Sequence, residues 1–216
     1  MTGHRQPVLL RFYLRFLDDQ DSASFIAATS TSYNCGTLER MAISDNIHQR
    51  RAATLALGFI GDYNCNATLG RALSDDDRGV RMIAEDGILR VWLRDGNPAE
   101  QSSLRKLTHC NNSQQYRQAL ILSDKLLSLS PQLAEAHHQQ AIAYFHLAAC
   151  RESLRSASQA AKLNRYHFLA VAIMGECYAR SGETAVALEC FQRALWLNPN
   201  REDFRVHVIR LKRSTT

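Results

Sequence analysis

Apolar residues recur every three or four positions along much of the chain, which is the spacing of one face of an α-helix. One such run lies in the middle of the chain, at Val80, Ala84, Ile88 and Val91. Another lies within 201–213, at Phe204, Val208 and Leu211. A further amphipathic helix is predicted from about Pro7 to Asp18, where the proline suits a first helical turn. The pattern therefore predicts an all-α protein.

The first half of the chain repeats itself with an offset of 30 or 31 residues. The tripeptide Tyr-Asn-Cys at 33–35 returns at 63–65, and Ser-Asp at 44–45 returns at 74–75. Within each unit the apolar positions mark two short helices. A fixed period of this length is typical of stacked helical repeats, each of which buries its apolar face against a neighbour.

The second half has a different period, 34 residues. Four kinds of residue return at that spacing: Leu129, Leu163 and Leu197; Tyr144 and Tyr178; Ala160 and Ala194; Asn164 and Asn198. An earlier unit keeps only its second helix in this pattern, from Ala119 to Pro131. Its first helix, from about Pro98 to His109, matches poorly, and we interpret it as the joint between the two kinds of repeat.

The residues of the first half resemble the HEAT-repeat family, in the short variety also found in phycobilin-lyase-like proteins. The resemblance rests on Arg-Arg-Ala-Ala-Thr-Leu-Ala-Leu-Gly at 50–58 and Leu-Ser-Asp-Asp-Asp-Arg-Gly-Val-Arg at 73–81. In that family an acidic turn residue and an arginine six positions later pair between repeats, which implies such a role for Asp75 and Arg81. The spacing in the preceding repeat is five rather than six, from Asp45 to Arg50.

The second half resembles the tetratricopeptide (TPR) repeat, with Val171 where that pattern has tryptophan. The two resemblances imply a right-handed α-α superhelical solenoid of stacked helix pairs. Its expected parts are N-terminal capping helices at 1–32, HEAT-like repeats at 33–94, and TPR repeats with a C-terminal capping helix at 95–216.

Composition supports this fold and narrows the function. The 216 residues include only 10 Gly and 4 Pro, too few for the hairpins of an all-β protein. A net charge of +5 is no signature of nucleic-acid binding. The apolar runs near the N-terminus are too short for a signal peptide or a membrane span, and no C-x-x-C pair occurs among the six cysteines. We therefore expect a cytoplasmic protein with free thiols.

Catalysis is not predicted, because the sequence contains none of the phosphate-binding, nucleophile or zinc-protease motifs. The best metal-like cluster is His137 and His138 with His146 and Cys150, but it lacks a fourth ligand at suitable spacing. Cys177 and Cys190 lie on the two helices of one repeat, so a redox pair is one interpretation. The ordinary role of such cysteines is that of small apolar residues in the core. No metal, cofactor or catalytic residue is therefore expected.

The TPR resemblance implies a concave groove built from the first helix of each repeat. The family geometry assigns to it Glu135, His138, Ile142, Phe145, His146, Leu169, Ala172, Glu176, Ala179 and Arg180. The Lys and Asn clamp with which chaperone-tail-binding TPR domains hold a terminal carboxylate is missing from this region. We expect a protein-interaction scaffold or adaptor whose groove holds a peptide or helix with apolar and charged anchors.

Two other functions stay open at the level of sequence. Short HEAT repeats also occur in accessory subunits that handle a tetrapyrrole chromophore. The basic C-terminal helix could contact nucleic acid, although Phe204 is the one aromatic residue there. The sequence specifies neither the identity of the partner nor the oligomeric state.

Overall fold

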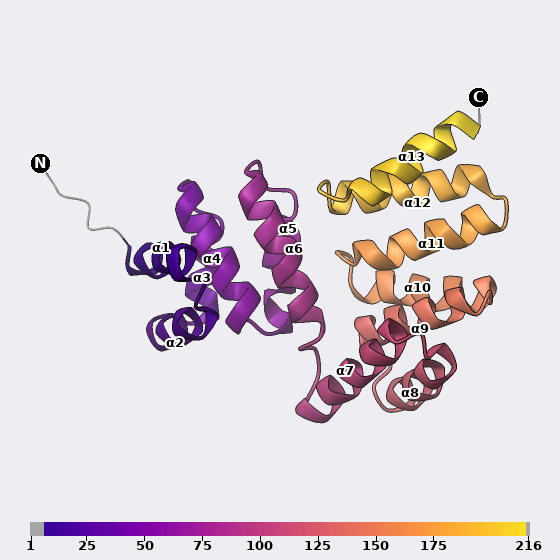
Figure 1. Ribbon diagram of the computed structural model, residues 1–216, viewed down its shortest axis with the longest axis horizontal. Coiled ribbons are helices and arrows are strands. Elements are labelled where there is room, and N and C mark those ends of the chain that lie inside the picture. The colour runs from indigo at the N-terminus through magenta and orange to yellow at the C-terminus, as the bar shows by residue number, and fades with distance from the viewer. Residues whose placement is uncertain (1–6, 215–216) are drawn as a thin grey trace, which may run out of the picture. The chain divides into compact units, whose positions relative to one another are not determined.

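The computed structural model describes residues 7–214, and residues 1–6 and 215–216 of the predicted capping segments lie outside the described part. All secondary-structure elements of the described residues are helices, in agreement with the predicted all-α solenoid (Figure 1). The chain divides between Val91 and Trp92 into two compact units. None of the described helices combines the length and the apolar character needed to cross a membrane.

The first unit begins with two helices that cover a third. Helices α1 (Val8–Asp19) and α2 (Ser22–Ser32) both pack against α4 (Ile47–Ile60). Their contact contains the rings of Phe16, Phe25 and Phe59, whose centroids lie 5.4 to 6.0 Å apart. The amphipathic helix predicted from about Pro7 to Asp18 is thereby confirmed, because α1 buries Leu9 and Tyr13 on one face.

The rest of the first unit consists of short and long helices in alternation. These are α3 (Cys35–Met41), the long helix α4, the 3-10 turn η1 (Tyr63–Cys65), α5 (Asn66–Ala72) and α6 (Arg78–Trp92). The last residue of α6, Trp92, belongs to the second unit. Asn34 and Asp62, which precede the repeated cysteines, accept hydrogen bonds from the backbone of the turn that follows. This side-chain capping explains why a helical turn starts at the Tyr-Asn-Cys motif in both repeats.

Two bidentate ion pairs join the loop before α6 to α4. The Arg50 guanidinium donates to both carboxylate oxygens of Asp75, at 2.8 and 3.0 Å, and Arg51 donates to those of Asp77, both at 2.7 Å. Asp75 thus pairs between repeats, as the HEAT resemblance implies, with Arg50 as its partner, while Arg81 donates to the backbone carbonyls of Asp75 and Asp76. The pair is bidentate, the geometry in which a guanidinium and a carboxylate bind each other strongly.

Helices α4 and α6 approach each other at a pair of glycines. A Cβ placed on Gly58 would lie 2.7 Å from the Cα of Gly87, and one placed on Gly87 would lie 3.0 Å from the Cα of Gly58. Contact of this kind is backbone against backbone, so a side chain at either position has no rotamer that relieves it. The two helices can pack this closely only because both residues are glycine.

The second unit is a stack of helix pairs with one further helix (Figure 1). The pairs are α7 (Pro98–Asn112) with α8 (Tyr116–Leu129), α9 (Ala134–His146) with α10 (Cys150–Leu163), and α11 (Phe168–Arg180) with α12 (Thr184–Leu197). Helix α13 (Glu202–Ser214) packs on α12. Close approach inside a pair depends on small residues, since a Cβ on Gly175 would lie 2.9 Å from the Phe191 ring.

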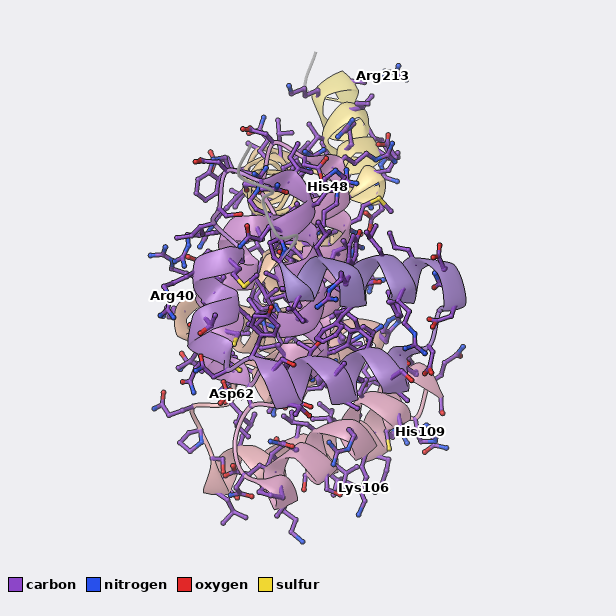
Figure 2. The ribbon with its side chains drawn as sticks, turned by 90° about the vertical axis from the view of Figure 1, so that its left-hand side faces the viewer. Arg40, His48, Asp62, Lys106, His109 and Arg213 are labelled. Carbon is purple, nitrogen blue, oxygen red and sulfur yellow. The ribbon has the colours of Figure 1, made fainter. Side chains whose placement is uncertain are left out.

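Helix α7 is the first helix of a pair, where the sequence places a poorly matching first helix. It packs against α8 and also against α9, as a first helix of a repeat does. A reciprocal capping box starts it: the Asn97 side chain accepts from the Glu100 backbone N–H, and the Glu100 carboxylate accepts from the Asn97 N–H at 2.6 Å. The exposed side of α7 carries Lys106 and His109 (Figure 2).

One turn recurs after the first helix of each pair. Gln114, Ala148 and Gly182 stand 34 residues apart, and their φ angles are 58°, 60° and 79°. Glycine adopts this left-handed conformation without strain, whereas glutamine and alanine do not. Three different residues thus make the same turn at the same place in the repeat.

Candidate functional site

A pocket of about 320 Å³ opens on the side of the second unit formed by the first helices of its repeats. Helices α9, α11 and α13 supply its walls, with one residue from α12. We call it the groove pocket; its lining is His138, Ile142, Phe145, His146, Leu169, Ala172, Ile173, Glu176, Phe191, Asp203, Phe204 and His207.

Most residues that the TPR geometry assigns to the groove meet in this pocket. His138, Ile142, Phe145, His146, Leu169, Ala172 and Glu176 line it together. Glu135 does not, because its carboxylate is buried behind the wall. Arg180 lies beside the pocket, over the Phe145 ring, and Ala179 is half-buried outside the lining.

Helix α13 is the part of the site that the sequence did not indicate. The sequence predicts a C-terminal capping helix, and in the structure Asp203, Phe204 and His207 of this helix also form the third wall of the pocket. The signal available in the sequence is the spacing of Phe204 and His207, three residues apart and so on one helix face. The capping helix α13 therefore lines the pocket together with the first helices α9 and α11.

One edge of the groove pocket is a run of stacked side chains. The Arg180 guanidinium lies 3.5 Å from the centre of the Phe145 ring and donates to the Phe145 carbonyl at 2.9 Å. The Phe145 ring meets His146 edge-on, and His146 stacks on Tyr116 with centroids 4.5 Å apart. These contacts join α8, α9 and α11 and hold Phe145 in place.

The opposite edge joins α11, α12 and α13. The His207 ring stacks on Phe191, with the centroids 4.4 Å apart and the planes at 7°. Its Nε2 lies 3.1 Å from Oε1 of Glu176, whose side chain is 34% exposed. Between the two edges Ile142, Leu169 and Ile173 present half-buried apolar surface. The site is thus an apolar floor with polar groups at both sides.

A buried network supports His138 from behind. Glu135 Oε1 lies 3.2 Å from Nδ1 of His138 and accepts from the Gln139 amide at 2.7 Å, while Oε2 lies 3.1 Å from Nε2 of His167. The His167 ring stacks on Trp92 at 4.1 Å. Every polar atom of the Glu135 carboxylate therefore has a partner, as burial requires.

Burial and hydrogen bonding shift the pKa values of this network in opposite directions. Burial acts to raise the pKa of Glu135, but its electrostatic interaction with His138 and its hydrogen bonds to His138 and His167 outweigh burial and hold that pKa well below its usual range. Burial, with the nearby His138, lowers the pKa of His167 to about 4 despite the bond to Glu135. The folded state thus favours an ionised Glu135 and a neutral His167.

Glu135, His138 and His167 also have the composition of a metal site, since one ligand atom from each lies within 4.8 Å of the others. The position of the proton on the His167 ring disfavours metal binding. Its Nδ1 accepts from the Ala170 backbone N–H at 3.2 Å, so the neutral ring carries its proton on Nε2, the atom that faces Glu135. A metal would need that nitrogen unprotonated. The cluster is better suited to hydrogen bonding than to metal binding.

The metal-like residues singled out in the sequence have other partners. His137 Nε2 lies 2.9 Å from the Pro131 carbonyl, and His138 and His146 are held as described above. Cys177 donates to the Ser153 hydroxyl at 3.3 Å rather than pairing with Cys190. Burial raises the pKa of the Cys177 thiol to about 11, which lowers its reactivity at neutral pH.

The network makes the stability of the second unit dependent on pH. Between pH 6.5 and 4 the unfolded chain takes up a proton at His167 that the folded chain does not, so the free energy of unfolding falls as the pH falls. We expect a loss on the order of 2 kcal/mol between pH 7 and 4.5. Urea unfolding at both pH values measures it, and His167→Gln is expected to reduce the loss by half or more. Equal losses in the two proteins would contradict the assignment.

Paired helices stacked with a groove along their first helices define a TPR-like helical repeat. Comparison of structures agrees: the first TPR of Spaghetti (RPAP3) bound to the HSP90 peptide SRMEEVD matches with a TM-score of 0.52 and 19% identity. The match covers 54% of this chain and 92% of that one, and at this identity it shows the fold alone. No protein-family model matches the chain, and no curated protein matches its sequence.

Proposed function

We propose that the protein is a non-catalytic interaction scaffold or adaptor, and that its groove pocket binds a peptide or helix of another protein. The observation that carries the proposal is the apolar floor of Ile142, Leu169 and Ile173 between two edges rich in polar groups. Such a surface suits a segment that inserts an apolar side chain and hydrogen-bonds at its sides. The peptide held by the TPR of the structural neighbour supports the same use of the fold.

We propose different kinds of repeat in the two parts of the chain. The second unit, with its TPR repeats within 95–216, holds the partner. For the first part of the chain we propose a capping pair at 1–32 and HEAT-like repeats at 33–94, of which the last three residues fall in the second unit. Residence in the cytoplasm is part of the same proposal.

The test uses a random 12-residue peptide library displayed on phage, selected on the full chain. Phe145→Ala is expected to weaken the selected peptides about thirtyfold, because aromatic anchors commonly carry 2 kcal/mol or more of the cost of truncation in an interface. Arg180→Ala is expected to act in the same direction, since Arg180 holds the Phe145 ring. Isothermal titration calorimetry with one selected peptide measures both effects.

Trp196→Ala is the matched control, because Trp196 is an aromatic residue 77% exposed on α12 and absent from the pocket lining. It should leave the affinity unchanged. Circular dichroism is expected to show the same helix content in all variants. If Phe145→Ala binds as tightly as the unaltered chain, the groove pocket is not the binding surface.

A further inference from the structure

The groove pocket differs in charge from what an acidic peptide requires. Among the described residues that line it, the acidic side chains are Glu176 and Asp203, and the lining contains neither lysine nor arginine. The peptide of the structural neighbour, SRMEEVD, carries three acidic side chains. Such a peptide would place like charges together in a partly desolvated groove, which costs binding free energy.

Two guanidinium groups lie near the pocket, and both are already engaged. Arg180 lies on the Phe145 ring and donates to its carbonyl, at the α9 edge. Arg201 donates to both oxygens of Asp203, at 2.8 and 2.5 Å, and lies 4.5 Å from the centre of the Phe204 ring. Arg201 thus neutralises Asp203, and neither arginine is directed to the apolar floor.

Glu176 is therefore the group that gives the pocket its charge. Its neighbour His207 bonds one carboxylate oxygen and is held in a stack on Phe191. The side chain keeps a third of its surface exposed, toward the pocket that it lines. A carboxylate in this position can accept a second hydrogen bond from a cation without breaking the bond to His207.

We infer that the groove pocket selects a segment with one large apolar side chain and an adjacent lysine or arginine, the apolar side chain lying on Ile142 and Ile173 and the cation on Glu176. The inference rests on the proposed function. It adds the chemistry of the partner and its orientation: the cation lies on the α11–α13 side, away from Arg180 at the other edge. Acidic tails are excluded by the same carboxylate.

The test is the phage selection run on the full chain and on three variants. Glu176→Gln removes the proposed contact but keeps an oxygen that can accept from His207. Glu189→Gln is the matched control, because it removes the same charge from the exposed side of α12. Phe145→Ala reports whether selected peptides use the groove at all.

We expect peptides selected on the unaltered chain to be enriched in a lysine or arginine beside an apolar residue. Replacing that basic residue by glutamate in a synthetic peptide should weaken binding at least tenfold, as measured by fluorescence anisotropy at 50 mM salt, where screening is modest. Glu176→Gln should abolish the enrichment, whereas Glu189→Gln should preserve it. The peptide SRMEEVD should bind more weakly than every basic peptide selected.

Three results would overturn the inference, and they differ in what they say of the proposed function. Peptides that depend on Phe145 but show no basic preference, or tighter binding of SRMEEVD, would overturn the charge selection and leave the groove as the binding surface. Selected peptides that ignore Phe145 would overturn both.

Discussion

Glu135→Ala is expected to lower the free energy of unfolding of the second unit by about 3–5 kcal/mol, the cost of removing one partner from a buried charged network. The substitution takes away the acceptor of His138, His167 and Gln139 at once, and leaves three buried polar groups unpaired. It also leaves a cavity between α9 and α11. Urea unfolding followed by circular dichroism at 222 nm measures the loss.

Two further variants show whether the charge or the shape of Glu135 matters. Glu135→Gln keeps the volume and one acceptor oxygen, so it should cost less than the alanine variant. Glu189→Ala makes the same chemical change on the exposed side of α12 and should stay within about 0.5 kcal/mol. If Glu135→Ala and Glu189→Ala are equally stable, the network does not hold the repeats together.

Gly58→Leu is expected to destabilise the first unit by about 3 kcal/mol or more, at the upper end of the range for overpacking. The first atom of the new side chain would already lie 2.7 Å from the backbone of α6, so α4 and α6 must move apart and lose the contacts on both sides of the glycine pair. Thermal unfolding followed by circular dichroism, with urea unfolding to obtain the free energy, detects this.

Gly36→Leu provides the contrast for this prediction. Gly36 is exposed in α3, and a Cβ there would meet no atom closer than 3.7 Å. Leucine favours helix over glycine by about 0.8 kcal/mol, so this variant should be slightly more stable than the unaltered chain. Effects of opposite sign would establish the close approach of α4 and α6, whereas similar effects would refute it.

The TPR resemblance, set in register by the 34-residue period, implied which residues of the first helices lie together in the second unit, and most of them line the groove pocket. Phe145 lies one residue after the repeated Tyr144 and so on a different side of α9, and it lines the pocket. Periodicity carries this information because a helix advances 100° per residue whatever its neighbours are. The all-α stack follows from the same regularity.

The burial of Glu135 and its hydrogen bond to His167 could not be predicted in this way. Its helical position is that of a groove residue, but its partner His167 lies 32 residues away, in the loop before the next first helix. Spacing within one repeat says nothing of a hydrogen bond formed between two repeats. The same reason explains Arg50, whose partner Asp75 belongs to the following repeat.

In helix α7 the local sequence is more informative than the repeat pattern, which this helix matches poorly. Asn97, Pro98 and Glu100 contain all the elements of a helix start, including a reciprocal cap and a proline in the first turn. The period suggested a joint because few of the residues of α7 match those of α9 and α11. Capping residues specify where a helix begins, even where its packing face has diverged.

The left-handed turn after each first helix bears on how proteins of this kind diverge. Gln114 and Ala148 adopt a conformation that only Gly182 favours by its chemistry, so the packing of the helices on either side must impose it. Where the packed helices impose the backbone conformation, the residue at the turn need not itself favour that conformation. The consensus residue at this turn can then change while the turn itself is kept. Distant relatives of this chain should therefore be recognised more reliably by a left-handed residue that recurs every 34 positions than by an aligned glycine.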